Sequence, residues 1–246
     1  MGADVWELVV VGLAAAATSA LSGVAGAGGG VVLLLVLTLV VDPAVAIPVH
    51  GLVQIMANGT RAVSLGRRVR TDLIGWYVLA LVPFAVVGLA LADRLPRDPG
   101  RLLIGVFALV AVWWPAATSW LGRAGGGRRF VAVGAVAGVL NPTIGAPGPL
   151  LAPAFRAATD DHRQFVATFA SAQILGHLSK VVGFSVLGVA WAREVGLVAV
   201  AVVGVVAGTL VGTRWLLPRL APEPATRLFR VVVTATAARL VVGAVV

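Results

Sequence analysis

Long runs of apolar residues, interrupted by glycine and proline, follow one another along this chain. The interval 8–60 contains only one charged residue, Asp42, and as a single helix it would be about 80 Å long. The hydrocarbon core of a bilayer is about 30 Å thick, so the chain must turn within a membrane or at its edges. Ten apolar segments are predicted, at residues 5–25, 31–41, 44–63, 73–92, 102–120, 130–140, 148–157, 164–187, 195–213 and 225–244.

Three of these segments are too short to cross a bilayer alone: 31–41, 130–140 and 148–157. Such segments are expected to be half-helices or re-entrant hairpins. Broken backbone of this kind is tolerated at membrane depth only where protein or a water-filled cavity covers it.

The two halves of the chain resemble each other. Gln54 aligns with Gln173, Asn58 with His177 and Arg61 with Lys180, all at one constant offset. Each half holds five segments, and an odd number makes the second half enter the membrane from the opposite side. The pattern therefore predicts an all-α integral membrane protein with about 8–10 membrane segments. Residues 1–122 and 123–246 would be two inverted repeats that together form one transmembrane domain.

Composition and charge agree with a multi-pass protein of the cell membrane. Hydrophobic residues make up 59% of the chain and charged residues 12%, whereas soluble domains are about a quarter charged. The arginines lie at the ends of apolar spans, which membrane topology explains better than nucleic-acid binding. The larger set, predicted to be cytoplasmic, comprises Arg67, Arg68, Arg70, Arg123, Arg128, Arg129, Arg156, Arg163, Arg214, Arg219 and Arg227, and the smaller set comprises Arg94, Arg97, Arg101 and Arg193. Both termini are then extracytoplasmic.

The candidate site begins with Lys180, the only lysine in the chain, which lies inside an apolar span. A cation near the bilayer centre costs roughly 2.5–3.5 kcal/mol on insertion scales, so it usually has a partner or a function. The polar residues around it form two helical stripes, one with His50, Gln54, Asn58 and Arg61, the other with Gln173, His177 and Lys180. Such donors and cations suit an oxyanion. Alternatively, these groups hold helices together or extend toward the membrane interface.

The second candidate element is a pair of glycine-rich breaks. GAGGG (26–30), with Gly28 and Gly29, precedes one short segment, and NPTIGAPGP (141–149), with Asn141, Thr143 and Gly148, precedes another. Helix starts favour anions through their free N–H groups and dipole. Close packing of small residues is the alternative interpretation.

The apolar spans lack the side chains that cation transport, metal binding and hydrolysis require. Every carboxylate maps to a loop or the end of a span, which argues against a cation transporter. The chain has no cysteine and no HExxH motif, so no catalytic residue, metal site or cofactor is predicted. A passive anion channel remains an alternative. A membrane-embedded enzyme or a lysine Schiff-base photoreceptor is a more distant one.

The segments SGVAGAGGGVVLLLVL (22–37) and AGVLNPTIGAPGPLLAPAF (137–155) resemble the paired signature of the TauE/SafE (TSUP) family, and the resemblance covers nearly the whole chain. The first copy lacks the proline of its short helix, and the second has GAPGP in place of a glycine triplet. The resemblance implies a transporter, and more specifically an exporter, of small sulfur-containing anions such as sulfite, organosulfonates or thiosulfate. It would work by alternating access where the repeats meet. A homodimer is compatible with the sequence.

Overall fold

The computed structural model describes residues 4–25, 29–65, 68–114, 126–211, 215 and 222–245. Within these ranges the chain folds into ten α-helices. They are α1 (Val5–Ala25), α2 (Gly29–Val40), α3 (Pro43–Leu65), α4 (Thr71–Asp93), α5 (Arg97–Trp113), α6 (Arg129–Ile144), α7 (Gly148–Arg156), α8 (His162–Val186), α9 (Trp191–Val211) and α10 (Pro222–Val245).

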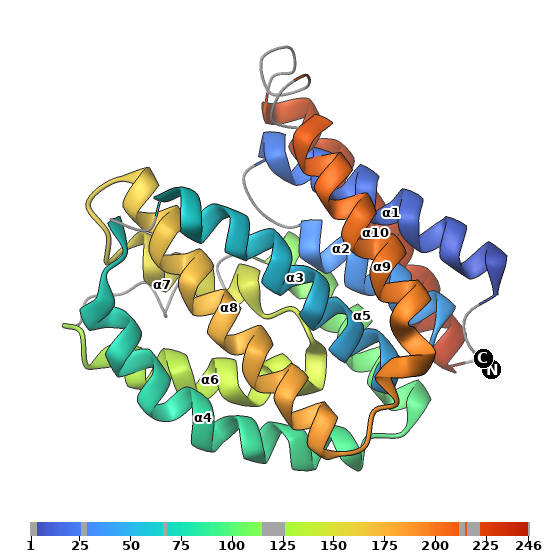
Figure 1. Ribbon diagram of the computed structural model, residues 1–246, viewed down its shortest axis with the longest axis horizontal. Helices are drawn as coiled ribbons and strands as arrows, with labels where there is room; N and C mark the ends of the chain where they lie inside the picture. The colour runs from blue at the N-terminus through green and yellow to red at the C-terminus, as the bar shows by residue number, and fades with distance from the viewer. Residues whose placement is uncertain are drawn as a thin grey trace.

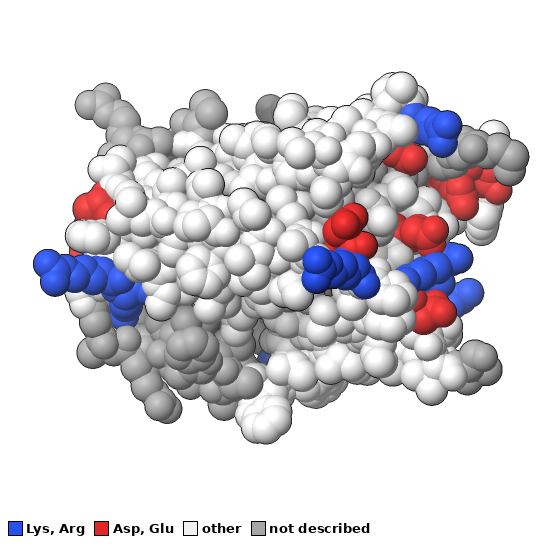
Figure 2. All heavy atoms as spheres, turned by 90° about the horizontal axis from the view of Figure 1, so that it is seen from below, with Lys and Arg blue, Asp and Glu red and all other residues white. Residues whose placement is uncertain are grey.

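The helices have the lengths and apolar surfaces of a membrane protein. Among the described residues, α4, α8 and α9 are long and apolar enough to cross a bilayer, and α2 and α6 are shorter apolar helices. Large apolar side chains such as Leu79, Val86 and Val203 are more than half exposed. On the face shown in Figure 2, most charged side chains gather toward the two ends, apart from neighbouring acidic and basic groups right of the middle, and a broad uncharged area lies to the left of those groups. This distribution suits a protein whose middle faces lipid.

The helices pack mainly in pairs that join the first half of the chain to the second. Helix α4 lies against α6, α1 against α9, α3 against α8 and α5 against α10. In Figure 1, α4, α6, α7 and α8 form one side of the molecule, and α1, α2, α9 and α10 form the other. Helix α3 lies between these groups and packs against α8, which brings together the two predicted polar stripes.

Glycines explain why two of these pairs are so close. A Cβ atom at Gly138 of α6 would lie 2.6 Å from a carbonyl oxygen of α4, and one at Gly204 of α9 would lie 2.5 Å from a carbonyl oxygen of α1. Gly134 and Gly208 pack against the same two partner helices just as tightly. Small residues let membrane helices approach backbone to backbone, so these contacts fix the positions of α6 and α9.

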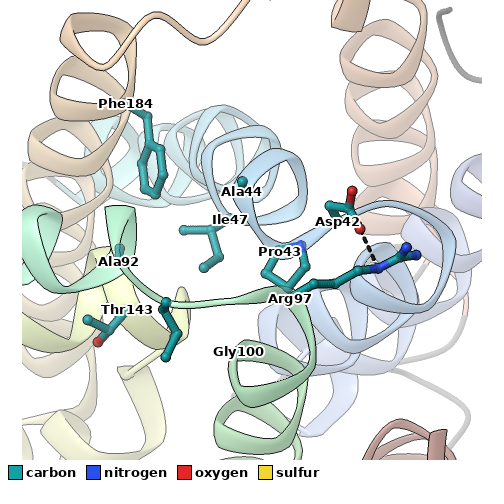
Figure 3. A pocket seen from close by; sticks show the side chains of 10 residues that line it. Asp42, Pro43, Ala44, Ile47, Ala92, Arg97, Gly100, Thr143 and Phe184 are labelled. Carbon is teal, nitrogen blue, oxygen red and sulfur yellow. Dashed lines mark ion pairs between the residues drawn. The ribbon is translucent and has the colours of Figure 1, made fainter. Parts of the chain in front are cut away.

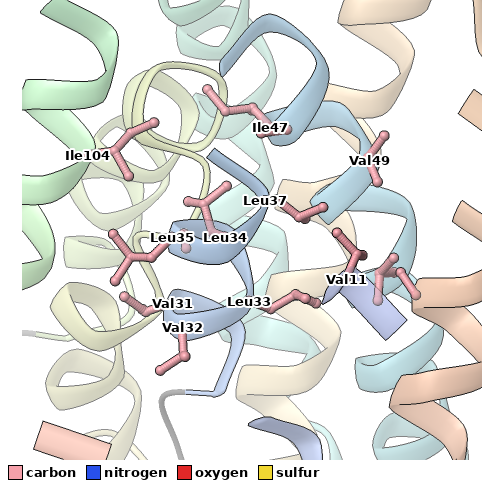
Figure 4. Packing of buried hydrophobic residues seen from close by; sticks show 14 of the residues in the cluster. Val11, Val31, Val32, Leu33, Leu34, Leu35, Leu37, Ile47, Val49 and Ile104 are labelled. Atoms are coloured by element: carbon pink, nitrogen blue, oxygen red, sulfur yellow. The ribbon is translucent and has the colours of Figure 1, made fainter. Parts of the chain in front are cut away.

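The short helix α2 is enclosed by protein. Its residues Leu33, Leu34, Leu35 and Leu37 are all at most 1% exposed. They pack in a core cluster with residues of α1, α3, α5, α9 and α10, part of which is drawn in Figure 4. At 12 residues α2 is too short to cross a bilayer, and its burial is what the membrane requires of such a helix.

The predicted segments correspond to the ten helices, and their ends differ most at α5, α6 and α9, the last of which begins at Trp191 instead of 195. Helix α6 runs through Asn141 and Pro142 to Ile144 instead of ending at 140. The side chains of Asn141 and Thr143 donate to the carbonyls of Ala137 and Val139 in the preceding turn, which extends the helix beyond the proline. Helix α5 begins at Arg97 and ends at Trp113, whereas the predicted segment was 102–120, and residues 115–125 lie outside the described ranges.

Candidate functional site

Lys180 lies in the interior of the protein, on α8. Its side chain is 0% exposed. The Nζ atom donates to the carbonyl oxygen of Gly145 at 2.5 Å and lies 3.3 Å from Nδ1 of His50. In the described part of the chain, its contacts include no carboxylate. Lys180 therefore does not extend toward the membrane interface, and no carboxylate of the described residues compensates its charge.

Two histidines stand next to this lysine. The rings of His50 on α3 and His177 on α8 meet edge to face with centroids 5.6 Å apart, and each side chain is 1% exposed. A glycine on α3 makes room for Lys180 itself, since a Cβ at Gly51 would lie 2.7 Å from Cε of Lys180. The closeness of α3 and α8 thus depends on a missing side chain.

The carbonyl that binds Lys180 belongs to the break between α6 and α7. Gly145 ends α6 with a φ of +76°, a left-handed conformation that favours glycine. A Cβ there would also lie 2.8 Å from Cδ2 of Leu34. Residues 145–148 are all buried. Helix α7 then starts at Gly148 with Pro149 in its first turn, where a missing N–H has no cost.

The two glutamines of the polar stripes occupy matching positions at the two short helices. A Cβ at Gly30, in the first turn of α2, would lie 2.9 Å from Nε2 of Gln54. A Cβ at Gly148, in the first turn of α7, would lie 2.9 Å from Nε2 of Gln173. Each amide thus packs against the start of a short helix. Asn58 donates to the backbone oxygen of Gln54 at 3.0 Å, which ties its side chain to α3.

Most of the side-chain polar atoms that are buried without a hydrogen bond gather in this region. Among the described residues they include Nε2 of His50, Nδ1 of His177, Oε1 of Gln173, Oδ1 of Asn141 and the hydroxyl of Tyr77. A buried polar group without a partner costs about 1–3 kcal/mol, so it usually signals a function or a bound species. The cluster has the chemistry to satisfy a small polar ligand.

Tyr77 of α4 belongs to this cluster, although the sequence reasoning did not select it. A Cβ at Gly176 would lie 2.6 Å from Nδ2 of Asn141 and 3.3 Å from the Tyr77 hydroxyl, so both reach the same point of α8. The side chain of Tyr77 is 0% exposed. It is the only tyrosine of the chain, and a single hydroxyl within an apolar span was the signal available in the sequence.

The structure brings most of the predicted site residues together, but not all. His50, Gln173, His177, Lys180 and Asn141 surround the α6–α7 break, as described above. The amide of Asn141 and the hydroxyl of Thr143 donate within α6, so those donors are already used. Gly29 is buried at the start of α2. Gly28 and the side chain of Arg61 lie outside the described residues.

The chemistry of this arrangement favours an anion. In the described part of the chain, no group of three or more His, Cys, Asp or Glu side chains is placed to hold a metal ion. The cluster contains a cation, two imidazoles, the amide nitrogen of Gln173 and a phenol, each of which can donate a hydrogen bond to an oxyanion. A charge-assisted hydrogen bond from Lys180 would be the strongest of these contacts.

Comparison with known proteins agrees with this chemistry. The model of the family described as "Sulfite exporter TauE/SafE" matches residues 11–240. No curated protein and no solved structure matches the chain.

Proposed function

The chain belongs to the sulfite exporter TauE/SafE family, and we propose that it carries its substrate by alternating access, with Lys180 at the centre of the substrate site. Membership makes it a membrane transporter of sulfite- or sulfonate-type anions and not an enzyme. The proposal concerns the mechanism, the site residues and the direction, for which export is the expected one.

One observation carries the proposal: Lys180 is a fully buried cation without a carboxylate partner in the described part of the chain. Keeping such a charge in a low-dielectric interior is costly unless another charge or strong hydrogen bonds compensate it. The Gly145 carbonyl and His50 supply only part of that compensation. An anionic substrate would supply the rest, which links the charge of Lys180 to the class of substrate that the family carries.

The pattern of helix packing supports two inverted repeats, residues 1–122 and 123–246. If α1 to α5 correspond to α6 to α10, the contact of α4 with α6 has its counterpart in the contact of α9 with α1. The α3–α8 and α5–α10 pairs each join equivalent helices. The matching Gln54–Gly30 and Gln173–Gly148 contacts follow the same correspondence. Transporters built in this way bind substrate where the repeats meet, which is where Lys180 lies.

The distribution of arginines supports an orientation with both termini outside the cell. Six of the described arginines lie at the ends of α3, α4, α6, α7 and α8 that face the loops 66–70, 126–129 and 156–163, and four, Arg94, Arg97, Arg101 and Arg193, lie near the opposite ends of these helices or at the starts of α5 and α9. Lysine and arginine accumulate on the cytoplasmic side. The substrate would therefore leave the Lys180 site toward the opposite end, near Arg97.

Flux into proteoliposomes tests the proposal, with sulfite and taurine as substrates and Lys180→Gln beside the wild type. Saturable wild-type flux that can be driven uphill is expected, and Lys180→Gln is expected to lose about 10- to 100-fold, since a hydrogen bond to a charged group contributes about 1.5–3 kcal/mol. Arg193→Gln is the matched control, because it removes the same charge from an exposed position on α9.

Three outcomes would contradict parts of the proposal. Full flux in Lys180→Gln would make Lys180 a structural residue that holds α8 to the α6–α7 break. Flux that follows the gradient and never saturates would favour the passive channel. Folded wild-type protein that moves neither anion would refute the assigned substrate class.

A further inference from the structure

A pocket of about 180 Å³ opens at the end of the molecule opposite the arginine-rich loops. It lies between the start of α3, the start of α5 and the ends of α4, α6 and α8, as Figure 3 shows. Asp42 and Arg97 stand at its rim, and Ile47, Thr143 and Phe184 line its inner part. One water occupies about 30 Å³ in the liquid, so the space would hold about six waters or one small organic anion.

An exposed ion pair controls the charge of this pocket. Nε of Arg97 lies 2.5 Å from Oδ1 of Asp42, and the two side chains are 55% and 53% exposed. Exposed ion pairs contribute little to stability and are screened by salt, so an anion from solution can compete with Asp42 for Arg97 at a small cost. Arg97 is also at the first position of α5, and Asp42 directly precedes α3. The starts of two helices add positive potential to the charge of Arg97.

The inner wall of the pocket adjoins the Lys180 site. Cγ1 of Ile47 would lie 3.3 Å from a Cβ at Gly145, the residue whose carbonyl binds Lys180. Ile47 is also one helical turn before His50 on α3, and Thr143 is two residues before Gly145. Ile47 is 3% exposed and Thr143 6%. The inner wall of the pocket thus packs against the residue whose carbonyl binds the buried lysine.

We infer that this pocket is a second anion site, in which Arg97 holds the sulfonate or sulfite group in place of Asp42 as the substrate passes between the Lys180 site and solution. The inference rests on the proposed function. The anion would bind Arg97 through its oxygens, as a carboxylate does now, and Asp42 would turn to water. When the anion leaves, Asp42 pairs with Arg97 again and lowers the affinity of the pocket, which favours release.

The absence of cysteine from the chain allows a test that does not require transport. Ala44 lies at the exposed rim of the pocket, so Ala44→Cys introduces one reactive thiol there. The purified protein is labelled with methanethiosulfonate reagents that carry either a sulfonate or a trimethylammonium group. The ratio of the two rates measures the electrostatic preference of the pocket for an anion.

The inference predicts opposite effects of the two rim residues on this ratio. Added to Ala44→Cys, Asp42→Asn should raise this ratio about 25-fold and Arg97→Gln should lower it about 25-fold. One charge over about 4 Å of water changes the rate of each reagent about five-fold, in opposite directions for the two reagents, so the ratio changes by the product. Asp161→Asn is the matched control. It frees Arg68 from a comparably exposed ion pair at 3.2 Å and should leave the ratio unchanged.

A flux measurement separates failure of this inference from failure of the proposed function. If the wild type transports sulfite, Arg97→Gln should raise KM several-fold and leave the flux at saturation nearly unchanged, because the Lys180 site is intact. If the protein transports sulfite normally but neither rim variant changes the labelling ratio, the anion site is refuted. If Arg97→Gln lowers the labelling ratio but the protein transports no sulfur anion, the anion site stands and the proposed transport is refuted.

Discussion

Lys180 and Arg97 are two cations beside helix ends, and they differ in how the protein compensates them. Lys180 is 0% exposed and binds a backbone carbonyl and a histidine. Arg97 is 55% exposed and binds Asp42. No carboxylate among the described residues neutralises the buried cation, whereas the exposed cation has its own counter-ion. An anion can therefore bind at Lys180 without competition, but at Arg97 it must first displace a carboxylate.

This difference suits two successive steps of transport. A charge in a low-dielectric site interacts more strongly with an anion than the same charge in water does. The Lys180 site is thus suited to selecting and holding the substrate, and the Arg97 pocket to exchanging it with solution. A substitution in the Lys180 site should therefore reduce flux more than an equivalent substitution in the Arg97 pocket.

The largest effect is expected from Lys180→Arg, although it keeps the positive charge. Cε of Lys180 already lies against Gly51, and its Nζ is 2.5 Å from the Gly145 oxygen, so a guanidinium does not fit. Overpacking a core costs about 1–3 kcal/mol, and flux should fall about 10- to 100-fold. Proteoliposome flux of the folded variant measures this. Wild-type flux in Lys180→Arg would show that charge alone, and not its position, is sufficient.

A smaller effect is expected from a pair of glycine substitutions, one at each cation. A Cβ at Gly51 would lie 2.7 Å from Cε of Lys180, whereas a Cβ at Gly100, in the pocket, would meet Leu95 and Pro43 at an ordinary 3.5 Å. Gly51→Ala should displace Lys180 and reduce flux about ten-fold, in line with a loss of about 1–2 kcal/mol. Gly100→Ala should leave flux within a factor of about two. Equal losses in the two variants would contradict the contrast between the sites.

The helices could be predicted from the sequence because apolar runs, glycines and prolines mark them directly. The ten segments, the short enclosed helix α2 and the stripe with Gln173, His177 and Lys180 follow from the spacing of apolar and polar residues along the chain. The end of α6 does not, because its last turn continues past Pro142 and depends on side-chain hydrogen bonds from Asn141 and Thr143. Local propensity treats that proline as a break.

The partners of the buried residues could not be predicted in the same way. Helical period places Lys180 on the polar face of α8, but it does not say which helix lies opposite. Its neighbours His50 and Gly145 are 130 and 35 positions away in the chain. They reach Lys180 because Gly51 has no side chain and Gly145 adopts a positive φ. Tyr77 joins the site through the α4–α6 packing, which no single segment reveals.

Tyr77→Phe tests whether the unpaired polar atoms of the buried site serve the substrate. The hydroxyl is fully buried without a hydrogen bond in the described structure, so its removal should leave the thermal midpoint unchanged or raise it. If the hydroxyl binds substrate, KM should rise about two- to ten-fold, the equivalent of about 0.5–1.5 kcal/mol. Ser171→Ala is the control, because that hydroxyl bonds within α8. A lower midpoint with an unchanged KM would give Tyr77 a structural role.

The smallest effect concerns Asp161, an exposed carboxylate at the end of the molecule far from Arg97. Its pKa is lowered because its carboxylate accepts the backbone N–H of Gln164 at the start of α8, with smaller contributions from the N–H of Arg163 and the charge of Arg68. A lowered pKa contributes stability above the unfolded value of about 3.9 that is lost as pH falls through the folded pKa.

Asp161→Asn keeps the helix cap without the charge. Its thermal midpoint should therefore fall less than that of the wild type below about pH 4, while flux at neutral pH stays the same. An equal fall in both proteins would show that the charge of Asp161 contributes nothing to the fold, and a loss of flux would mean that exposed ion pairs at both ends of the protein take part in transport.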